Sequence, residues 1–472
     1  MSNKNMNPIF SLRNFRSFGE DGAKFELAPI TVLTGCNSAG KSSLVKALML
    51  LSNQPKSLFV SSSEYDIKRY MPAPDLYINA KALMLGQFDN VINDKSDSNV
   101  ISFSYRVWSD CLQEEVIVTR QFVSKRDRIN NATLRELTIE KIDGTQIYWV
   151  NAEKGHLEKV NFDAIEENYN QNASAVDLFL KKNADEWTEL YSKMLTEQQK
   201  VERKKNNYIS LLVNEVTNSW FTQNIEYINS SSAVVNRLYS IEDDNKINKA
   251  LRAWNERSND YSNEYFADPY LVWNEPGAFL KKWIKEFQIG DSIEFEGTPE
   301  GLGVLVYLVK DGVKRLLADE GYGITQLVSL LLQINNSIQM CVQPDIETSD
   351  YVYPNKLICV EEPEVHLHPK YQSLLAKMFV EAYQKYNIHF VIETHSEYLI
   401  RMLQVMVADK NYKLKSEDVS LNYVEKDGNG VSTNRKIEIQ GDGRLSEPFG
   451  PGFFDQATGL SINLLKMKIE SK

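Results

Sequence analysis

The chain has 472 residues, of which 42% are hydrophobic and 25% are charged, and its 64 acidic and 53 basic residues give a net charge of −11. This length provides for two or three domains and a substantial buried core. The negative charge argues against a protein that coats DNA or a membrane surface by bulk attraction, although a local basic patch would still allow contact with nucleic acid.

The cysteines lie far apart and form no CxxC pair, which argues against a zinc ribbon or a disulfide framework and suits a reducing compartment. They are Cys36, Cys111, Cys341 and Cys359. The sequence has no apolar run near the ~18–20 residues that cross a bilayer, and its opening MSNKNMNPIF contains no apolar signal segment. We therefore expect a cytoplasmic protein without a membrane partner.

The first third of the chain predicts strands around one buried helix. Residues 9–12 alternate in polarity and residues 29–34 form a short apolar run, as strands do. A glycine-rich turn then leads into an apolar helix over residues 42–52. Further strands are predicted over residues 100–105 and 115–119, each bounded by polar residues.

Residues 151–225 predict a helical insertion, because glycine disappears from 161 to 219 and strong helix formers dominate. The simpler interpretation is a solvated pair of helices. The alternative is a lid or a partner-docking arm that touches nucleic acid through a basic run, but this run is short and interleaved with glutamate. It consists of Lys200, Arg203, Lys204 and Lys205.

After residue 265 strands and helices alternate again. Residues 357–360 and 389–392 are apolar runs typical of buried strands, and residues 370–385 between them predict a helix. This order favours an α/β fold whose sheet is mainly parallel, with helices on both faces.

A phosphate-binding loop of the pattern GxxxxGK[ST] is predicted between the apolar strand and the helix, since residues 35–42 read GCNSAGKS. Its glycines let backbone N–H groups turn toward phosphate oxygens, and the N-terminus of the following helix adds positive potential. Lys41 would reach the β- and γ-phosphates of ATP, and the Ser42 hydroxyl would bind Mg²⁺. An ordinary glycine turn is the alternative. The predicted nucleotide-binding residues are Gly35, Asn37, Ser38, Ala39, Gly40, Lys41, Ser42 and Ser43.

Two adjacent carboxylates end the apolar run LICVEEP. In open α/β sheets, ligands bind at the carboxyl ends of strands. Because side chains alternate along a strand, the two carboxylates are expected to act differently. Glu361 would support Mg²⁺ through its water shell, and Glu362 would polarise the attacking water. Alone, this pattern is more often a strand end that meets solvent, and the phosphate-binding loop upstream is what favours the catalytic interpretation.

A histidine follows the second apolar strand in the segment IETHS. At such a strand end His395 can hydrogen-bond a γ-phosphate, although an isolated histidine is more often structural. Its place roughly thirty residues after the glutamate pair, with a helix between, favours the phosphate contact. His366 and His368 would bind zinc only with further ligands, and we interpret them as part of a turn that ends at Pro369.

These three segments, in this order, resemble the soluble branch of the ABC-class ATPases that contains the SMC-type DNA-repair ATPases and the OLD (overcoming lysogenisation defect) family. The opening FSLRNFRSFGEDGAKFELAPITVLTGCNSAGKSSLVKAL is similar to that branch's first strands and P-loop, VEEPEVHLHPKYQ to its Walker B and D-loop segment, and IETHSEYLIR to its switch-histidine segment. The resemblance implies an α/β P-loop NTPase of ABC type, with a mixed sheet and a helical insertion. It implies that Lys41, Glu362 and His395 are catalytic and that ATP and Mg²⁺ are bound.

Two further segments carry the resemblance. LGQF places Gln87 where a Q-loop would be, as a sensor of the γ-phosphate and Mg²⁺, and residues 319–326 (DEGYGITQ) are similar to the degenerate signature of these proteins. In this class the signature of one subunit closes over ATP bound to the other, which implies a dimer or higher homo-oligomer with composite sites. Gly321, Gly323 and Thr325 would then contact ATP. LSGGQ itself is not present, and Thr325 stands where many relatives have serine.

The resemblance covers about residues 1–110 and 226–440 and implies three parts. An N-terminal ATPase lobe with the P-loop is expected over 1–150 and the helical insertion over 151–225. A C-terminal ATPase lobe with the signature, Walker B segment and switch histidine is expected over 226–472. The tail segment GPGFFDQ resembles the ending of a bacterial subgroup of standalone ATPases.

OLD nucleases carry a Toprim nuclease domain after the ATPase. Here the segment from residue 396 to residue 472 has no DxD pattern and is shorter than an ordinary domain. The resemblance therefore implies an ATPase that works with a separate effector, such as a nuclease or a toxin, as standalone relatives in anti-phage defence operons do.

Three functions remain open. The first is an ATP-driven molecular switch that senses a trigger, hydrolyses ATP slowly and controls that effector. The alternative is an ATP-dependent DNA-binding clamp or scaffold of a repair or restriction system, but a pure binder would not need the carboxylates and His395. The motor subunit of a membrane transporter is disfavoured by the inserted helices and the degenerate signature.

Overall fold

The computed structural model describes residues 7–53, 58–60, 69–71, 75–80, 83–124, 131–152, 157–171, 196–223, 225–229, 237–240, 275–298, 303–341, 343–344, 351–450, 453–454, 460, 462–463 and 467. The chain forms two compact units, each assembled from segments that lie far apart in the sequence. The first unit holds residues 1–27, 37–225 and 424–435, and the second holds residues 28–36, 226–423 and 436–472.

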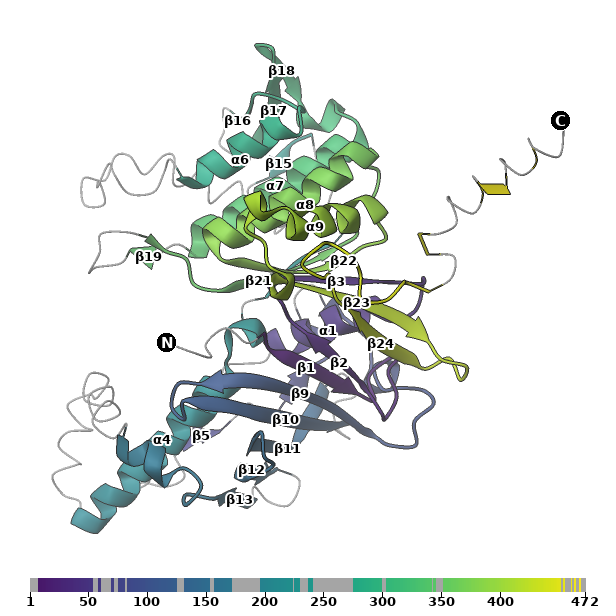
Figure 1. Cartoon of the computed structure of the whole chain (residues 1–472). Helices are drawn as coiled ribbons and strands as arrows, with labels where there is room; N and C mark the ends of the chain where they lie inside the picture. The colour runs from purple at the N-terminus through teal and green to yellow at the C-terminus, as the bar shows by residue number, and fades with distance from the viewer. Residues whose placement is uncertain are drawn as a thin grey trace, which may run out of the picture. The chain divides into compact units, whose positions relative to one another are not determined.

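An eight-stranded antiparallel sheet forms the body of the first unit (Figure 1). Its path runs through β13 (Leu157–Val160), β12 (Gln146–Asn151), β11 (Asn131–Lys141), β10 (Glu114–Ser124), β9 (Val100–Ser109), β1 (Ile9–Arg13) and β2 (Ala23–Glu26), and β6 (Asp75–Tyr77) pairs with β11. Every second residue of β9 is buried. One face of the sheet therefore packs into the core, where Phe10 and Phe103 stack, and the other face remains half-exposed.

Helices α1 (Lys41–Ser52) and α4 (Glu197–Thr217) also belong to this unit, and α1 confirms the helix predicted over 42–52. Helix α4 lies within the region predicted to be helical, but β13 in the same region is a strand that pairs with β12. Residues 172–195 of that region lie outside the described residues. In the predicted basic run, Lys205 has its Nζ 4.1 Å from the centroid of the Phe162 ring. The shorter elements are β4 (Leu58–Val60), β5 (Arg69–Met71), β7 (Asn79–Ala80), β8 (Leu83–Met84), η1 (Phe88–Asn90) and η2 (Trp220–Thr222).

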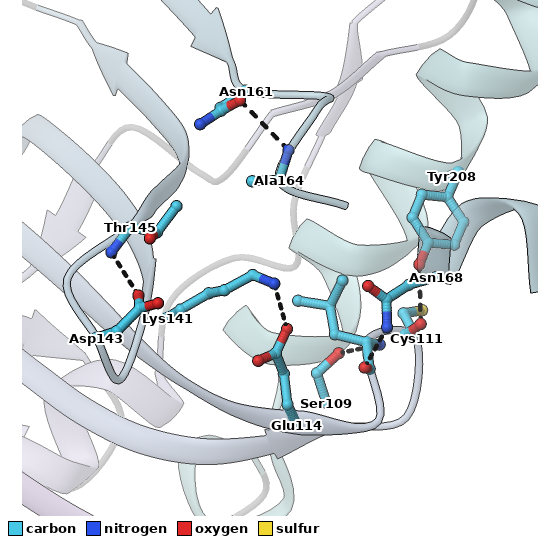
Figure 2. A network of polar contacts seen from close by, with 11 residues as sticks. Ser109, Cys111, Glu114, Lys141, Asp143, Thr145, Asn161, Ala164, Asn168 and Tyr208 are labelled. Carbon is cyan, nitrogen blue, oxygen red and sulfur yellow. Dashed lines mark hydrogen bonds and ion pairs between the residues drawn. The ribbon is translucent and has the colours of Figure 1, made fainter. Parts of the chain in front are cut away.

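Hydrogen bonds anchor α4 to the hairpin that joins β9 to β10 (Figure 2). The Tyr208 hydroxyl of α4 donates to the carbonyl of Cys111 (2.8 Å). Asn168, which precedes α4 in the chain, binds the same hairpin by donating its side chain to the carbonyl of Leu112 (2.6 Å). A carboxylate oxygen of Glu215, near the end of α4, accepts the N–H of Cys111 at 3.2 Å. Burial and the nearby charge of Glu215 raise the pKa of the Cys111 thiol, which keeps it neutral. The C-terminal half of α4 is thereby fixed to the sheet.

Parallel strands run through the second unit in the order β14 (Glu226–Ile228), β21 (Lys356–Glu361), β22 (Ile388–Glu393) and β3 (Ile30–Gly35), and β23 (Val419–Lys426) and β24 (Ser432–Ile437) follow β3 in the strand order. All residues of β3 and β22 are buried, which explains why they are unbroken apolar runs in the sequence. The buried strands predicted at 357–360 and 389–392 are confirmed. The expectation of a mainly parallel sheet holds for these strands and not for the antiparallel sheet of the first unit.

Helices of the second unit pack on one another and on these strands (Figure 1). They are α6 (Glu275–Glu286), α7 (Tyr322–Cys341), α8 (Pro369–Tyr386) and α9 (Glu397–Ala408). The rings of Phe379 on α8 and Phe390 on β22 have their centroids 4.8 Å apart. Helix α8 begins where predicted, because His368 accepts the N–H of Lys370 and Pro369 occupies the first turn.

A second antiparallel sheet completes this unit. It contains β15 (Tyr239–Ser240), β17 (Gly303–Lys310), β16 (Ser292–Gly297) and β18 (Val313–Leu316). The remaining elements are β19 (Gln343–Pro344), β20 (Tyr351–Val352), η5 (Leu317–Asp319), η6 (Lys410–Tyr412) and η7 (Ser416–Asp418). In the part of the chain that the structure describes, no helix has both the length and the apolar character needed to cross a membrane.

Candidate functional site

The predicted phosphate-binding loop leaves β3 at Gly35 and enters α1 at Lys41. Gly35, Ser38 and Gly40 have positive φ angles of 130°, 60° and 103°. Glycine is required at position 40 for two reasons, since the backbone is left-handed and an added Cβ would lie 2.2 Å from the Ser17 Oγ. The glycine pattern in the sequence therefore reflects the backbone path of the loop.

A strand from far along the chain supports the back of this loop. Ser432, the first residue of β24, donates its hydroxyl to the carbonyl of Ala39 (2.5 Å) and its N–H to the carbonyl of Ser17 (2.8 Å). Sequence reasoning missed both contacts, because 393 positions separate Ser432 from Ala39 and no motif marks either serine.

Exposure and charge at the loop suit an anion. Residues 36–38 are exposed, whereas Lys41 is 4% exposed. Helix α1 begins without a side-chain cap and has no acidic residue in its first turn, so the positive potential of its N-terminus is available to a ligand. Ser42 is half-buried and Ser43 is buried in this first turn. Here the loop has the local features that phosphate binding requires.

The three strands that carry the predicted motifs are neighbours in the second unit. β21 pairs with β22, and β22 pairs with β3, all in parallel. Glu361 stands opposite Glu393, and Glu393 stands opposite Leu33. The carboxyl ends of the three strands therefore meet at one edge of the sheet, where Gly35 ends β3 and His395 follows β22.

Glu361 and Glu362 are set apart by a turn. β21 ends at Glu361, and Glu362 then adopts a left-handed φ of 42°, which costs a non-glycine residue on the order of 1 kcal/mol. The N–H of Glu362 donates to the carbonyl of Glu393 at 2.8 Å. Both glutamates are half-buried. Glu361 is thus the last residue of the strand and Glu362 the first residue beyond it, and the different roles of the two carboxylates stay a prediction.

Tyr227 is a neighbour of Glu361 that the sequence patterns did not indicate. It lies on β14, opposite Cys359 of β21, and its hydroxyl hydrogen-bonds the Glu361 carboxylate. Burial, followed by this bond and by the charges of Glu361 and Glu393, raises the pKa of Tyr227. The phenol therefore stays protonated and orients the carboxylate as a donor. Strand β14 is too short for its sequence to have revealed this role.

Backbone hydrogen bonds fix the segment that contains His395. The N–H of Thr394 donates to the carbonyl of Leu33 (3.0 Å), and the N–H of His395 donates to Oε1 of Glu364 (2.7 Å). Ser396 then caps α9 with its side chain. His395 itself is half-buried. Its predicted place at a strand end is confirmed, whereas the contact with Glu364 was not predicted.

Helix α7 begins inside the predicted signature segment. Gly321 is exposed, and Gly323 lies so close to the turn after β21 that an added Cβ would be 2.5 Å from the carbonyl oxygen of His366. Thr325 is buried, and its hydroxyl donates to the carbonyl of Tyr322 in its own helix (2.7 Å). The contacts of Gly321, Gly323 and Thr325 with ATP in a second subunit stay a prediction.

Gln87 lies in the first unit, where it is exposed between β8 and η1. Its neighbour Gly86 exchanges two hydrogen bonds with the side chain of Asn79, at 2.7 and 2.8 Å. These bonds fix the backbone that carries Gln87. Its role as a sensor stays a prediction.

The other downstream histidines have structural contacts. The ring of His366 meets that of Tyr322 with centroids 4.7 Å apart, and His368 caps α8. His389 is buried and its ring packs on Tyr383, and burial lowers its pKa to about 4. These positions agree with the interpretation of His366 and His368 as part of a turn.

Two sequence families match the chain. The family described as "AAA ATPase domain" matches residues 9–400, and the family described as "Protein of unknown function (DUF3696)" matches residues 414–464. The second match includes the tail segment GPGFFDQ, which lies partly outside the described residues.

Known proteins also resemble the chain. Endonuclease GajA from Bacillus cereus (strain HuB5-5) is 20% identical over 433 residues, which are 82% of this chain and 57% of GajA. The chain thus spans little more than half the length of that curated relative. The crystal structure of the SmcHead bound to the C-winged helix domain of ScpA has a TM-score of 0.44, 11% identity and coverage of 92% and 97% of the two chains. The SMC head domain from Thermotoga maritima has a TM-score of 0.38, 12% identity and coverage of 91% and 98%.

Proposed function

The chain belongs to the AAA ATPase domain family and is an ATP hydrolase with an α/β P-loop fold. On this premise we propose that it is an ABC-type ATPase that works as an oligomeric molecular switch. In this proposal, ATP binding and slow hydrolysis let it sense a trigger and control a separate effector in anti-phage defence. The effector would be a nuclease or a toxin. The observation that carries the catalytic part is the alignment of β3, β22 and β21, which gathers the ends of the three motif-bearing strands at one edge.

The phosphates of ATP would be bound by the loop and the start of α1. Backbone N–H groups of residues 35–43 and the helix N-terminus attract the anion, and Lys41 neutralises charge on the β- and γ-phosphates. The Ser42 hydroxyl and the Gln87 side-chain oxygen would supply oxygen ligands of the kind that Mg²⁺ prefers, and Glu361 would support the ion through its water shell. Bound Mg²⁺ would neutralise further phosphate charge. The hydrogen bond from Tyr227 to Glu361 fits such a site, because it orients a carboxylate that would otherwise rotate.

Hydrolysis would proceed by in-line attack of water. Glu362 orients the water and accepts its proton as the water oxygen bonds to the γ-phosphorus and the bond to the leaving ADP oxygen breaks. His395 donates a hydrogen bond to the γ-phosphate, and Lys41 stabilises the charge that develops. The signature segment of a second copy, residues 319–326, would close over the same nucleotide.

The deciding experiment replaces Glu362 by Gln. The amide keeps the size of the side chain but accepts the proton poorly, so we expect kcat to fall at least about 100-fold while ATP still binds. Steady-state hydrolysis and equilibrium binding of ATP measure the two quantities. Glu417→Gln, at an exposed glutamate paired with Lys415, is the matched control and keeps the normal rate. A normal rate in Glu362→Gln means that the base is assigned wrongly.

The oligomer and the effector have their own tests. In the Glu362→Gln variant, ATP should convert the protein to a stable homo-oligomer, seen by light scattering as an increase in mass that ADP does not produce. Mass spectrometry of intact complexes purified with the native operon should identify the effector. A mass that is the same with ATP and ADP contradicts the switch, and purification without any partner contradicts the control of an effector.

An ATP-dependent DNA-binding clamp or scaffold of a repair or restriction system is the second candidate. The likeness to a protein named as an endonuclease favours it, although the net charge of −11 does not. Because the match covers only part of GajA, its nuclease activity is not carried over to this chain. Measuring ATP turnover with and without DNA at 50 and 200 mM salt separates the candidates. Stimulation by DNA that weakens with salt supports the clamp, and an unchanged rate supports the switch.

A further inference from the structure

A buried carboxylate connects the two proposed catalytic segments of the second unit. Glu364 is 7% exposed, and its carboxylate accepts the N–H of His395 at 2.7 Å and the hydroxyl of Thr394. Its other oxygen, Oε2, has no hydrogen-bond partner among the described residues. Because burying an incompletely paired carboxylate is unfavourable, stability alone does not explain an acid at this position.

The connection runs in both directions. The N–H of Glu362 donates to the carbonyl of Glu393, and the N–H of His395 donates to Glu364. The end of β22 therefore binds the backbone of Glu362, and the turn after β21 binds the backbone of His395. A shift of one segment would break a hydrogen bond of the other.

Helix α8 adds a further link near the same place. Gln372 donates its Nε2 to the carbonyl of Leu367 (3.0 Å), and its Oε1 accepts the hydroxyl of Ser396 (2.6 Å). The turn after β21, the start of α8 and the segment after β22 are thus joined by side-chain hydrogen bonds. Gln372 reaches the segment one residue beyond His395, whereas Glu364 contacts the histidine backbone directly.

We propose that Glu364 is a positioning residue that holds the backbone of His395 at a fixed place relative to Glu362. This inference rests on the proposed roles of Glu362 and His395 and adds a residue that neither role requires. Without the carboxylate, the His395 segment shifts and its hydrogen bond to the γ-phosphate is lost. Nucleotide binding by the P-loop does not depend on this contact, so kcat changes and KM does not.

A double-mutant cycle on the full chain tests the inference. Glu364→Leu removes the acceptor at nearly constant size, whereas Glu364→Gln keeps a carbonyl oxygen for the N–H of His395. We expect Glu364→Leu to lower kcat for ATP at least about tenfold with KM within about threefold. The Gln variant should stay within about threefold of the native kcat. In a His395→Ala background, Glu364→Leu should lower kcat by less than about twofold, because the group it positions is already absent.

Each result decides the matter. If the losses from Glu364→Leu and His395→Ala multiply in the double variant, Glu364 does not act through the histidine and the inference is wrong. A Gln variant as slow as the Leu variant is equally contrary, because the acceptor is then not what matters. If thermal unfolding shows that the Leu variant does not fold, Glu364→Ala replaces it in the same cycle and in the same comparison with the Gln variant.

The failure of the inference is distinguishable from that of the proposed function. A normal kcat in His395→Ala removes the histidine from the proposed mechanism, and the inference with it. A reduced kcat in His395→Ala together with a normal kcat in Glu364→Leu removes the inference alone.

Discussion

Two loops that follow buried parallel strands reach left-handed backbone conformations by different means. After β3, the phosphate-binding loop has two glycines, Gly35 and Gly40, at positive φ together with Ser38 at 60°, whereas after β21 the chain places only non-glycine residues there, Glu362 at 42° and His366 at 60°. Glycine adopts such angles freely, and other residues lose roughly 1 kcal/mol each. The difference teaches that the loop proposed to bind phosphate through its backbone uses glycine at its two largest φ angles, while the turn that carries the Glu362 side chain accepts strain at a non-glycine residue.

Gly40→Ala should have the largest effect, and it changes the phosphate-binding loop. The new Cβ would sit 2.2 Å from the Ser17 Oγ on a backbone at φ 103°, so the loop must change its path. We expect ATP binding to weaken by about 100-fold, equivalent to about 3 kcal/mol. Isothermal titration with ATP measures this.

The matched control is Gly312→Ala, at φ 75° in the turn between β17 and β18, where nothing lies within 4 Å of the added Cβ. This variant carries the backbone strain without a clash. It should lose on the order of 1 kcal/mol of unfolding free energy and bind ATP normally. Equal loss of binding in both variants would mean that the path of the phosphate loop is not what Gly40 provides.

Gly323→Ala on α7 should disturb the turn after β21, which contains Glu362 and His366. Its Cβ would lie 2.5 Å from the carbonyl oxygen of His366, a backbone atom that moves only with the whole turn. We expect a loss of about 1–3 kcal/mol in unfolding free energy and a roughly tenfold lower kcat, since the turn carries Glu362. Gly321→Ala, in open space, controls for stability and should unfold like the native protein. Unchanged stability in Gly323→Ala would contradict the close packing.

Tyr227→Phe tests how the Glu361 carboxylate at the end of β21 is held. Loss of the hydroxyl leaves Glu361 free to rotate, so the Mg²⁺ concentration for half-maximal hydrolysis should rise about tenfold. A titration of ATPase rate with Mg²⁺ at saturating ATP measures it. Tyr383→Phe, which removes a hydrogen bond to Asp418 (3.2 Å), is the control. The same Mg²⁺ requirement in Tyr227→Phe and the native protein would place Glu361 away from the metal.

Ser432→Ala should have the smallest effect, and it also concerns the phosphate-binding loop. It removes one hydrogen bond to the carbonyl of Ala39, worth about 1 kcal/mol, and should weaken ATP binding about threefold to fivefold. Equilibrium binding detects this difference. Thr433→Ala, next in the chain, removes an exposed 3.4 Å contact and should bind ATP like the native protein. Equal affinities in all three proteins would show that β24 does not support the loop.

The sequence predicts the phosphate-binding loop well because its requirements are local. Glycine spacing encodes the backbone angles of Gly35 and Gly40, and the flanking strand and helix have clear apolar patterns. The carboxylates and His395 were located by the same reasoning, since each follows an apolar run that had to be a buried strand.

The supporting residues could not be predicted in the same way. Ser432, Tyr227 and Glu364 act through partners that are set by the fold and not by spacing along the chain. Pairing in the first unit has the same character. Strands β9 and β10 show their alternation in the sequence. The pairing of β1 with β9, however, places Ser11 opposite Ser104, which lies far along the chain, and no local pattern specifies it.

The hydrogen bond between Ser432 and Ala39 can form only late in the synthesis of this segment of the chain. Synthesis proceeds from the N-terminus, so the glycine loop leaves the ribosome long before the strand that supports it, 393 positions later. Until β24 has been made and has folded, a growing chain carries the complete nucleotide motif without the strand behind it. The loop therefore gains this supporting hydrogen bond only after Ser432 has been made.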